Sequence, residues 1–579
     1  MADLRRRDVA GPLLCLGLFL LNTIFFTLVL ATVLFMFGVS VSAFHFPAAV
    51  LGAAAFSFCR RKDSRRDVAV ALAVGLVVLA ACILLSGYVD DWSWDGNSYH
   101  KGMTGALTWG WNPLRETFYQ FAQPYAFLDH CTATWYDAYP KATELFGACL
   151  HSFTGNIETG KSVNLLAMAS LFFLAWGMLA ETGLFRHWQS AVCAGLLVLT
   201  PTNASQIFTF YNDGFLANML LLCLIGLLYL TFYPGGERTA LAGYAVFVSI
   251  SLGFNIKFSA VLFFAVLCLT FFGFWAVGEL RSRGAAQGAR ALGGRFCLLA
   301  AGVLSGVLLL GSTSYVANTF RYHNPVYTMI GPGSTEIITS QIPAVFRPMS
   351  HPVRFILSLF SRTNADLELS AVELKLPFTF DQEEFYAAAS CDVRTAGWGV
   401  FFSGIFLISA AVIAVSLIRC RRSHPEIFRL SVLLSLMLAV SVLFIPGLCW
   451  ARYFTALFDI PVAALLFLFA WWNRRGGKGR LACALLLTAL LAANLAPSAS
   501  YSLLLLKNAG QNWEQLEELK QLTETRDVTL GYGGLGRFEG RMFNVFDAGI
   551  TNFTFEDVAP EDSTGSVFQR YPLYYRAEN

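Results

Sequence analysis

The chain has 579 residues, of which 56% are hydrophobic, and its mean hydropathy is +0.56; this composition excludes a soluble globular protein. The net charge is only +3 and is not gathered in one basic patch, so nucleic acid is not an expected partner. Apolar runs of about 18 residues or more recur along the chain, and each can cross the hydrocarbon of a bilayer. The expected fold class is therefore an all-α polytopic membrane protein.

About thirteen transmembrane helices are predicted. The first apolar run, Gly11 to Gly38, is too long for the hydrophobic part of a cleavable signal peptide and is interpreted as a spanning helix. One span starts at YNDGFLAN (211–218) and ends at YPGGER (233–238), and two close spans fall within 239–277. The first span is expected over 12–37, and the others over 41–58, 68–88, 162–180, 189–201, 296–316, 398–418, 427–446, 454–472 and 480–500.

The distribution of Lys and Arg predicts the orientation in the membrane. Short basic segments concentrate on the cytoplasmic side of multi-span proteins. With the predicted spans, nearly all of them fall on one side: Arg5 to Arg7, Arg60 to Arg66, Arg281 to Arg295, Arg419 to Arg422 and Arg474 to Arg480. We therefore expect a multi-pass protein of the cell membrane with a cytoplasmic N-terminus. Two long loops, 89–160 and 317–396, and the C-terminal tail are expected on the extracytoplasmic face.

The stretch VDDWSWDGNSYHKGMTGALTWGWNPL (89–114) directly follows the third span. Its carboxylates, Asp90, Asp91 and Asp95, lie among several tryptophans. An Asp at the centre of a bilayer costs about 2.5–3.5 kcal/mol, so these side chains must lie at the interface or in a wet cavity. An ordinary interfacial loop and a catalytic cleft both fit this stretch. Short apolar pieces after it, such as TGALTWGW and ETFYQFAQPYAFL, predict helices that lie in the interface.

The predicted topology brings many polar residues to the extracytoplasmic face. Lys257 lies within an otherwise apolar two-span unit, where a lone charge must reach water or find a partner. Arg452 is a cation at a turn on the side where topology does not favour cations. The others are Tyr99, His100, Asn112, Tyr139, Lys141, Glu144, Asp213, Arg321, His323, Asn324 and Tyr453.

Carboxylates and cations at one membrane surface suit sugar transfer from a polyprenyl phosphate. A carboxylate can deprotonate the incoming hydroxyl, which contributes about 10²–10⁴ in rate. Arg and Lys can stabilise the negative charge that develops on the departing phosphate.

Several motifs, taken in order, resemble the bacterial GT-C glycosyltransferases, which include the protein mannosyltransferase and aminoarabinose transferase relatives. They are D-x-x-x-Y-H (95–100), GWNP (110–113), YPKATEL (139–145), YNDGFLA (211–217), LGFNIKFSAVLF (252–263), HNPVYT (323–328) and ARYF (451–454). The resemblance implies a hexosyl- or pentosyltransferase that acts in cell-envelope glycan biosynthesis with inversion at the sugar. The implied partners are membrane lipid, a polyprenyl-phosphate-sugar donor, and a glycan, glycolipid or protein acceptor.

The same resemblance implies roles for individual residues. Asp95 is the expected catalytic base, with Asp91 as the second choice, and Lys257 and Arg452 are expected to contact the donor phosphate. The implied site-lining residues are Tyr99, His100, Asn112, Asp213, Asn324 and Tyr453. The implied divisions are a two-span N-terminal addition (1–66), a catalytic core (67–472), the last span (473–504) and a small extracytoplasmic tail (505–579).

Two other functions remain open at this point: a flippase or transporter of lipid-linked sugars, and a glycan ligase or polymerase with a diphosphate-linked donor. No cofactor is expected to be required, and no metal site is predicted. Asp90, Asp91 and Asp95 nevertheless offer oxygen ligands that a hard divalent cation could use. The pairing of Cys131, Cys149 and Cys391, which fall in polar segments, is also left open.

Overall fold

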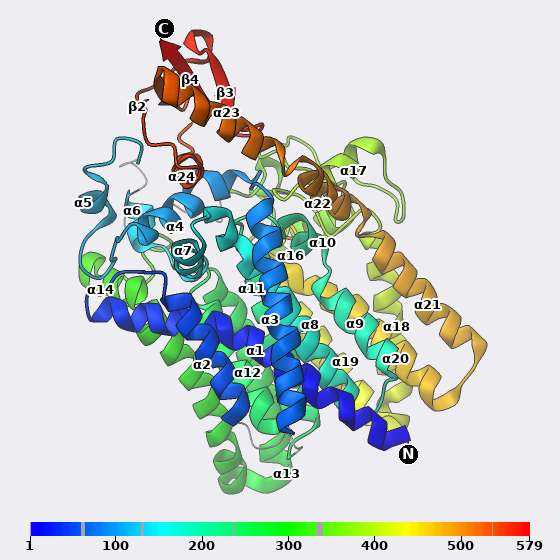
Figure 1. Cartoon of the computed structure of the whole chain (residues 1–579). Coiled ribbons are helices and arrows are strands. Elements are labelled where there is room, and N and C mark those ends of the chain that lie inside the picture. Colours follow the sequence, from blue (N-terminus) through cyan, green and yellow to red (C-terminus); the bar gives the residue numbers. More distant parts are fainter. Residues whose placement is uncertain are drawn as a thin grey trace.

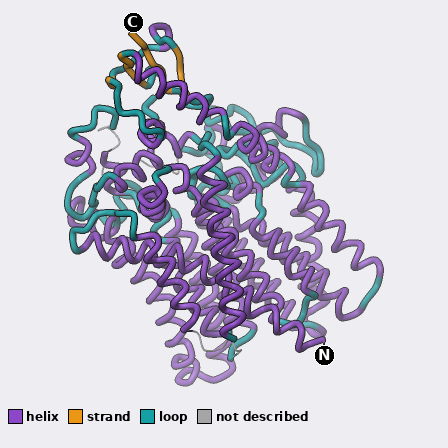
Figure 2. Tube along the Cα trace, in the orientation of Figure 1, coloured by secondary structure: helices purple, strands orange, loops and turns teal. Residues whose placement is uncertain are grey.

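The computed structural model describes residues 2–59, 64–128, 133–235, 238–331, 340–534 and 536–578 (Figure 1). Helices form a large bundle, and the strands of the described chain gather at its C-terminal end (Figure 2). The protein is an all-α polytopic membrane protein, as its composition predicts.

The first half of the bundle is built mostly from apolar helices, and a long loop separates the third of them from the next. They are α1 (Ala2–Met36), α2 (His45–Cys59), α3 (Arg65–Tyr88), α8 (Ser162–Glu181), α9 (His187–Val198), α10 (Pro201–Gln206), α11 (Asp213–Phe232), α12 (Thr239–Gly253) and α13 (Ala260–Leu304). The second half contributes α18 (Phe402–Ser423), α19 (Pro425–Phe444), α20 (Asp459–Arg475), α21 (Lys478–Ala493) and α22 (Ala496–Asn508).

Eight helices within the described residues are long and apolar enough to cross a membrane, and nine if the bent pair Lys478–Ala493 and Ala496–Thr525 is one span. The predicted count of thirteen is therefore not confirmed. The other predicted spans fall on shorter helices, including α2 and α12, and on α13. Gly284 breaks α13 with a φ of 74°. A Cβ on Gly288 would lie 3.0 Å from the carbonyl oxygen of Glu279, so the chain folds back on itself there.

Small residues allow α1 to pack closely along α8. A Cβ on Gly17 would lie 2.7 Å from the side chain of Leu174, and one on Gly177 would lie 2.7 Å from Leu14. The Ser170 hydroxyl donates a hydrogen bond of 2.9 Å to the carbonyl of Gly17. Close backbone approach and hydrogen bonds of this kind hold helices together in lipid, where burial of apolar side chains offers little.

The two long loops lie at one end of the bundle, which we call the cavity side. The first loop (89–160) contains α4 (Lys101–Thr108), α5 (Phe118–Ala122), α6 (Ala133–Ala138) and α7 (Ala142–Thr154), with the π-helical turn η1 (Gly96–His100) before α4. The second loop (317–396) contains the end of α14 (Tyr315–Tyr322), α16 (His351–Leu359) and α17 (Gln382–Ala389). The expected interfacial pieces of the first loop are largely buried within the protein: Leu107, Trp111 and Phe118 have no exposed surface.

The C-terminal tail forms a small appendage on the cavity side (Figure 1). Its helix α23 (Gln511–Thr525) leads into a four-stranded sheet of order β2-β1-β4-β3, with β1 parallel to β2 and antiparallel to β4. The elements that complete it are β1 (Asp527–Gly531), α24 (Glu539–Asp547), β2 (Thr554–Phe555), β3 (Gly565–Val567) and β4 (Leu573–Glu578). Helix α24 lies against the first loop, where Glu539 accepts a hydrogen bond of 2.8 Å from the Tyr136 hydroxyl.

Candidate active site

A cavity of about 590 Å³ lies where the two loops meet the ends of the helices. Aromatic rings form much of its wall, and two carboxylates and three cations project among them. The residues that line it include Trp94, Asp95, Tyr99, Trp135, Tyr139, Asn212, Lys257, Asp392, Arg394, Trp450, Arg452 and Tyr453. The cavity therefore combines flat aromatic faces with charged groups of both signs.

Arg452, in the turn before α20, is the centre of the site. Its Nε lies 2.7 Å from Asp213 Oδ2, its Nη2 lies 3.2 Å from Asp95 Oδ2, and its Nη1 contacts Asp392. The guanidinium also lies over the ring of Tyr211, 4.2 Å from its centroid. Burial disfavours the charged form, but the surrounding carboxylates outweigh it and raise the pKa of Arg452 above its usual value.

Lys257 lies beside Arg452, in the turn that joins α12 to α13. Its ammonium forms an ion pair with Asp213 and lies 4.7 Å from the centroid of the Tyr453 ring. Of the two options open for this lone charge, reaching water or finding a partner, the structure has the second. Asp213, with no exposed side-chain surface, thus holds both cations at one level.

Asp95 is the carboxylate of the first loop that faces the cavity. It immediately precedes η1, and a π-helical turn is frequently found at functional sites. Its side chain is 19% exposed, and burial raises its pKa, although Arg452 opposes the shift. A carboxylate with a raised pKa and an accessible oxygen has the properties of a general base.

Asp90 and Asp91 do not line the cavity; they fix the fold of the loop. Asp91 is fully buried and accepts hydrogen bonds from the backbone amides of Ser93 (2.7 Å) and Phe210 (3.0 Å). Asp90 pairs with Arg541 of α24 at 2.5 Å.

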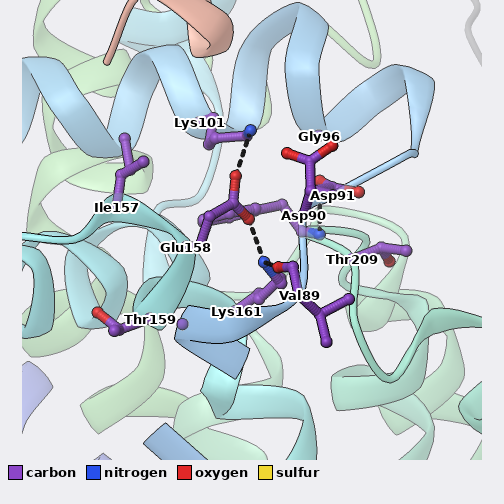
Figure 3. A network of polar contacts seen from close by, with 12 residues as sticks. Val89, Asp90, Asp91, Gly96, Lys101, Ile157, Glu158, Thr159, Lys161 and Thr209 are labelled. Atoms are coloured by element: carbon purple, nitrogen blue, oxygen red, sulfur yellow. Dashed lines mark hydrogen bonds and ion pairs between the residues drawn. The ribbon is translucent and has the colours of Figure 1, made fainter. Parts of the chain in front are cut away.

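A buried chain of charges lies behind this part of the loop (Figure 3). Glu158 lies between Lys101, at 2.6 Å, and Lys161. Asn544 of α24 accepts a hydrogen bond of 2.8 Å from Lys101, so the appendage and the first loop share this network.

The structure brings together some of the predicted site-lining residues and separates others. Tyr99 and Tyr453 line the cavity, and Asp213 lies beneath it on the two cations. The others are not among the residues of its wall. His100 is buried in a pair with Glu144; Asn112 bonds the carbonyl of Phe35 at 3.2 Å; Asn324 closes a turn with the amide of Val326 at 3.1 Å.

Asp392 and Arg394 belong to the cavity but were not predicted from the sequence. They come from the second loop, and Arg394 binds both Gln341 and Asp392, the latter at 3.2 Å. A signal was present in the sequence CDVRT (391–395), where two opposite charges stand directly before an apolar span.

An apolar groove reaches the same centre from within the bundle. Its wall includes Leu, Val, Phe and Met side chains of α11, α13 and α19, and Asn203, Asn218 and Asp459 also line it. Asp213, Arg452 and Tyr453 line it too, and the last two also line the cavity. Arg452 therefore stands where a polar cavity and an apolar groove meet.

Within the described ranges, no group of three or more His, Cys, Asp or Glu side chains is arranged to hold a metal ion. Cys149 and Cys391 are free thiols, and Cys131 lies outside the described residues.

No protein-family model matches the chain, and no curated protein matches it. Among solved structures, the chain is similar to ArnT from Cupriavidus metallidurans, which was crystallised bound to undecaprenyl phosphate. The two share 14% identity with a TM-score of 0.38, and the match covers 87% of this chain and 96% of that one.

Proposed function

We propose that this protein is an integral-membrane glycosyltransferase that moves a sugar from a polyprenyl phosphate to an acceptor hydroxyl on the extracytoplasmic face. The observation that carries the proposal is the position of Arg452 at the junction of the cavity and the apolar groove. A polyprenyl-phosphate sugar consists of an apolar chain, an anion and a polar ring. In that order, these three parts match the apolar groove, Arg452 and the polar cavity. The catalytic core is proposed to span residues 67–472.

The donor phosphate is proposed to bind Lys257 and Arg452. Both cations are held by carboxylates, but those carboxylates differ in exposure: Asp213 has no exposed side-chain surface, whereas Asp392 is 30% exposed. A phosphate can therefore replace Asp392 on the guanidinium while Asp213 keeps both cations in place. Arg is suited to this exchange because its fork binds two oxygens of one anion.

Asp95 is proposed to act as the base in a single displacement. It removes the proton from the acceptor hydroxyl, whose oxygen forms a bond to the anomeric carbon as the bond from that carbon to the phosphate oxygen breaks. The electron pair of the broken bond stays on the phosphate, where Lys257 and Arg452 stabilise the added charge. Attack from the face opposite the phosphate inverts the anomeric centre.

The experiment is a transfer assay with purified full-length protein and radiolabelled polyprenyl-phosphate sugars. The expected products are a labelled acceptor and free polyprenyl monophosphate in equal amounts. Release of a diphosphate would instead indicate a ligase or polymerase, and movement of the intact donor across a liposome membrane without release would indicate a flippase.

A matched pair of variants tests whether the cations of the site are responsible. Arg452→Met is expected to abolish transfer, whereas Arg321→Met should leave it near the wild-type rate. Arg321 is a cation of the same side that pairs with Asp137 at 3.4 Å and does not line the cavity. Equal activity in the two variants would contradict the proposal.

A further inference from the structure

We propose that the second loop inserts two apolar surfaces into the lipid leaflet on the cavity side. One surface belongs to residues 374–380 and the other to helix α16. The proposal is independent of the proposed enzymatic function, because it concerns a lipid contact and not the cavity.

Residues 374–380 expose large apolar side chains at every second position. The exposed fractions are 60% for Leu374, 75% for Leu376, 40% for Phe378 and 46% for Phe380. A contiguous patch of this kind on a protein surface marks a site of contact with lipid or with another protein. Four such side chains in water would be unfavourable by the hydrophobic effect.

A buried ion pair holds this segment in its conformation. Lys375, whose side chain is 6% exposed, pairs with the fully buried Glu384 of α17 and donates a hydrogen bond of 2.9 Å to the carbonyl of Val400. Because Lys375 points inward, its neighbours Leu374 and Leu376 are directed outward. The exposure is thus a property of an ordered segment.

The segment lies at the level where the hydrocarbon begins. The Phe380 ring packs edge-on against Phe401, 5.4 Å between centroids, and Phe401 precedes the first residue of the spanning helix α18. A Cβ on Gly404, in the first turn of α18, would lie 2.3 Å from the Phe378 ring. The apolar side chains therefore sit beside the first turn of a membrane span.

Helix α16 occupies the corresponding place on the neighbouring span. Its Phe355 and Leu359 are buried in the protein core, whereas Val353 and Ile356 on the other face are exposed. His351, at its start, lies 3.3 Å from the carbonyl of Leu443, near the end of the spanning helix α19. Helix α16 thus presents exposed apolar side chains at the end of a span.

The occupant of both surfaces is inferred from their continuity with the lipid-facing surface of α18 and α19. These two spans pack against each other, and their exposed side chains include Leu407 and Ile418 on α18 and Phe444 at the end of α19. The two apolar surfaces extend this surface at its cavity-side end. We infer that bilayer lipid covers both surfaces, and that their side chains reach only the part of the acyl chains nearest the headgroups.

The test uses full-length protein in nanodiscs that contain a phospholipid with a photoactivatable diazirine near the glycerol. After irradiation, lipid adducts are mapped by mass spectrometry. Adducts are expected on residues 374–380 and on α16 as well as on α18. Strands β3 and β4 of the appendage, which lie beyond α23 at the outer end of the chain in Figure 1, are the unlabelled control. A probe with the diazirine at the end of the acyl chain should label α18 but neither loop surface.

A variant pair separates lipid contact from chance labelling. Leu376→Asp should lower the yield on 374–380 by about tenfold, because Asp is strongly disfavoured in the apolar part of the membrane. Gln382→Asp, at an exposed position of the adjacent helix α17, should leave the yield unchanged. The proposal is overturned if 374–380 and α16 are labelled no more than β3 and β4 while α18 is labelled. Cross-linking of these surfaces to a second copy of the chain, without lipid adducts, would also overturn it.

Discussion

Replacement of Asp95 by Asn is the most informative single change, because it removes the charge and keeps the size of the side chain. The amide oxygen of Asn can still accept the 3.2 Å hydrogen bond from Arg452, which also keeps its contacts with Asp213 and Asp392. Donor binding should therefore change little. A positioned base contributes about 10²–10⁴ in rate, so kcat should fall by that factor. The corresponding rise in the barrier is about 3–5 kcal/mol.

Steady-state transfer by the purified variant, with donor and acceptor varied separately, measures this effect. The expected result is a large loss of kcat with a donor KM within a few-fold of the wild-type value. Asp91→Asn is the comparison, since its fully buried carboxylate is occupied by backbone amides and does not reach the cavity. That variant should unfold more easily, yet its folded fraction should turn over at the normal rate. The reasoning fails if Asp95→Asn keeps kcat or if only its KM changes.

Further predictions follow from the contacts around the site. Lys257→Met should raise the donor KM by about 10- to 100-fold through loss of a charge-assisted bond, with Lys257→Arg less affected; an unchanged KM would remove Lys257 from the phosphate site. Asp392 raises the pKa of Asp95, and the base is lost as pH falls through that pKa. Asp392→Asn should therefore move the acid limb of kcat/KM to lower pH, and a shift upward would refute this coupling. Arg541→Met leaves the carboxylate of Asp90 buried without its cation and should lower the free energy of unfolding by about 3–5 kcal/mol, measured by denaturant titration; a stability equal to wild type would contradict the role of this pair. Transfer should be unaffected by EDTA, and restoration of a lost activity by Mg²⁺ or Mn²⁺ would show a metal requirement.

The helices of the bundle could be located from the sequence because hydropathy and the positions of Lys and Arg can be read from short stretches of chain. The break in α13 at Gly284 falls in the basic stretch predicted to join two spans. The number of membrane-spanning helices was less predictable. Helices such as α12 are shorter than the membrane is thick, so their position in it depends on the helices around them.

The convergence of Asp95, Lys257 and Arg452 was also predictable, since each is a charge in a setting where an unpartnered charge is unfavourable. The residue type alone does not tell whether Asn112 and Asn324 line a site or bond the backbone. Each amide bonds nearby backbone, and Asn112 also bonds Phe35, 77 residues away in the chain. Such partners are set by tertiary contacts, which a local pattern does not contain.

Asp392 was missed for the same reason. It stands in an irregular segment with no motif, and its partner Arg452 lies 60 residues further along the chain. The path of the backbone decides whether a carboxylate faces a cavity. In this loop the path depends on contacts between distant residues, such as the 2.9 Å hydrogen bond from the Ala396 amide to the Ser358 hydroxyl.

The most direct test of the account is a structure of the full-length protein with a polyprenyl phosphate bound. The account predicts that the phosphate lies within hydrogen-bond distance of both Lys257 and Arg452, with its chain in the groove between α11, α13 and α19 and Asp95 facing the free space of the cavity. A phosphate bound elsewhere, with the two cations still held by their carboxylates, would contradict it.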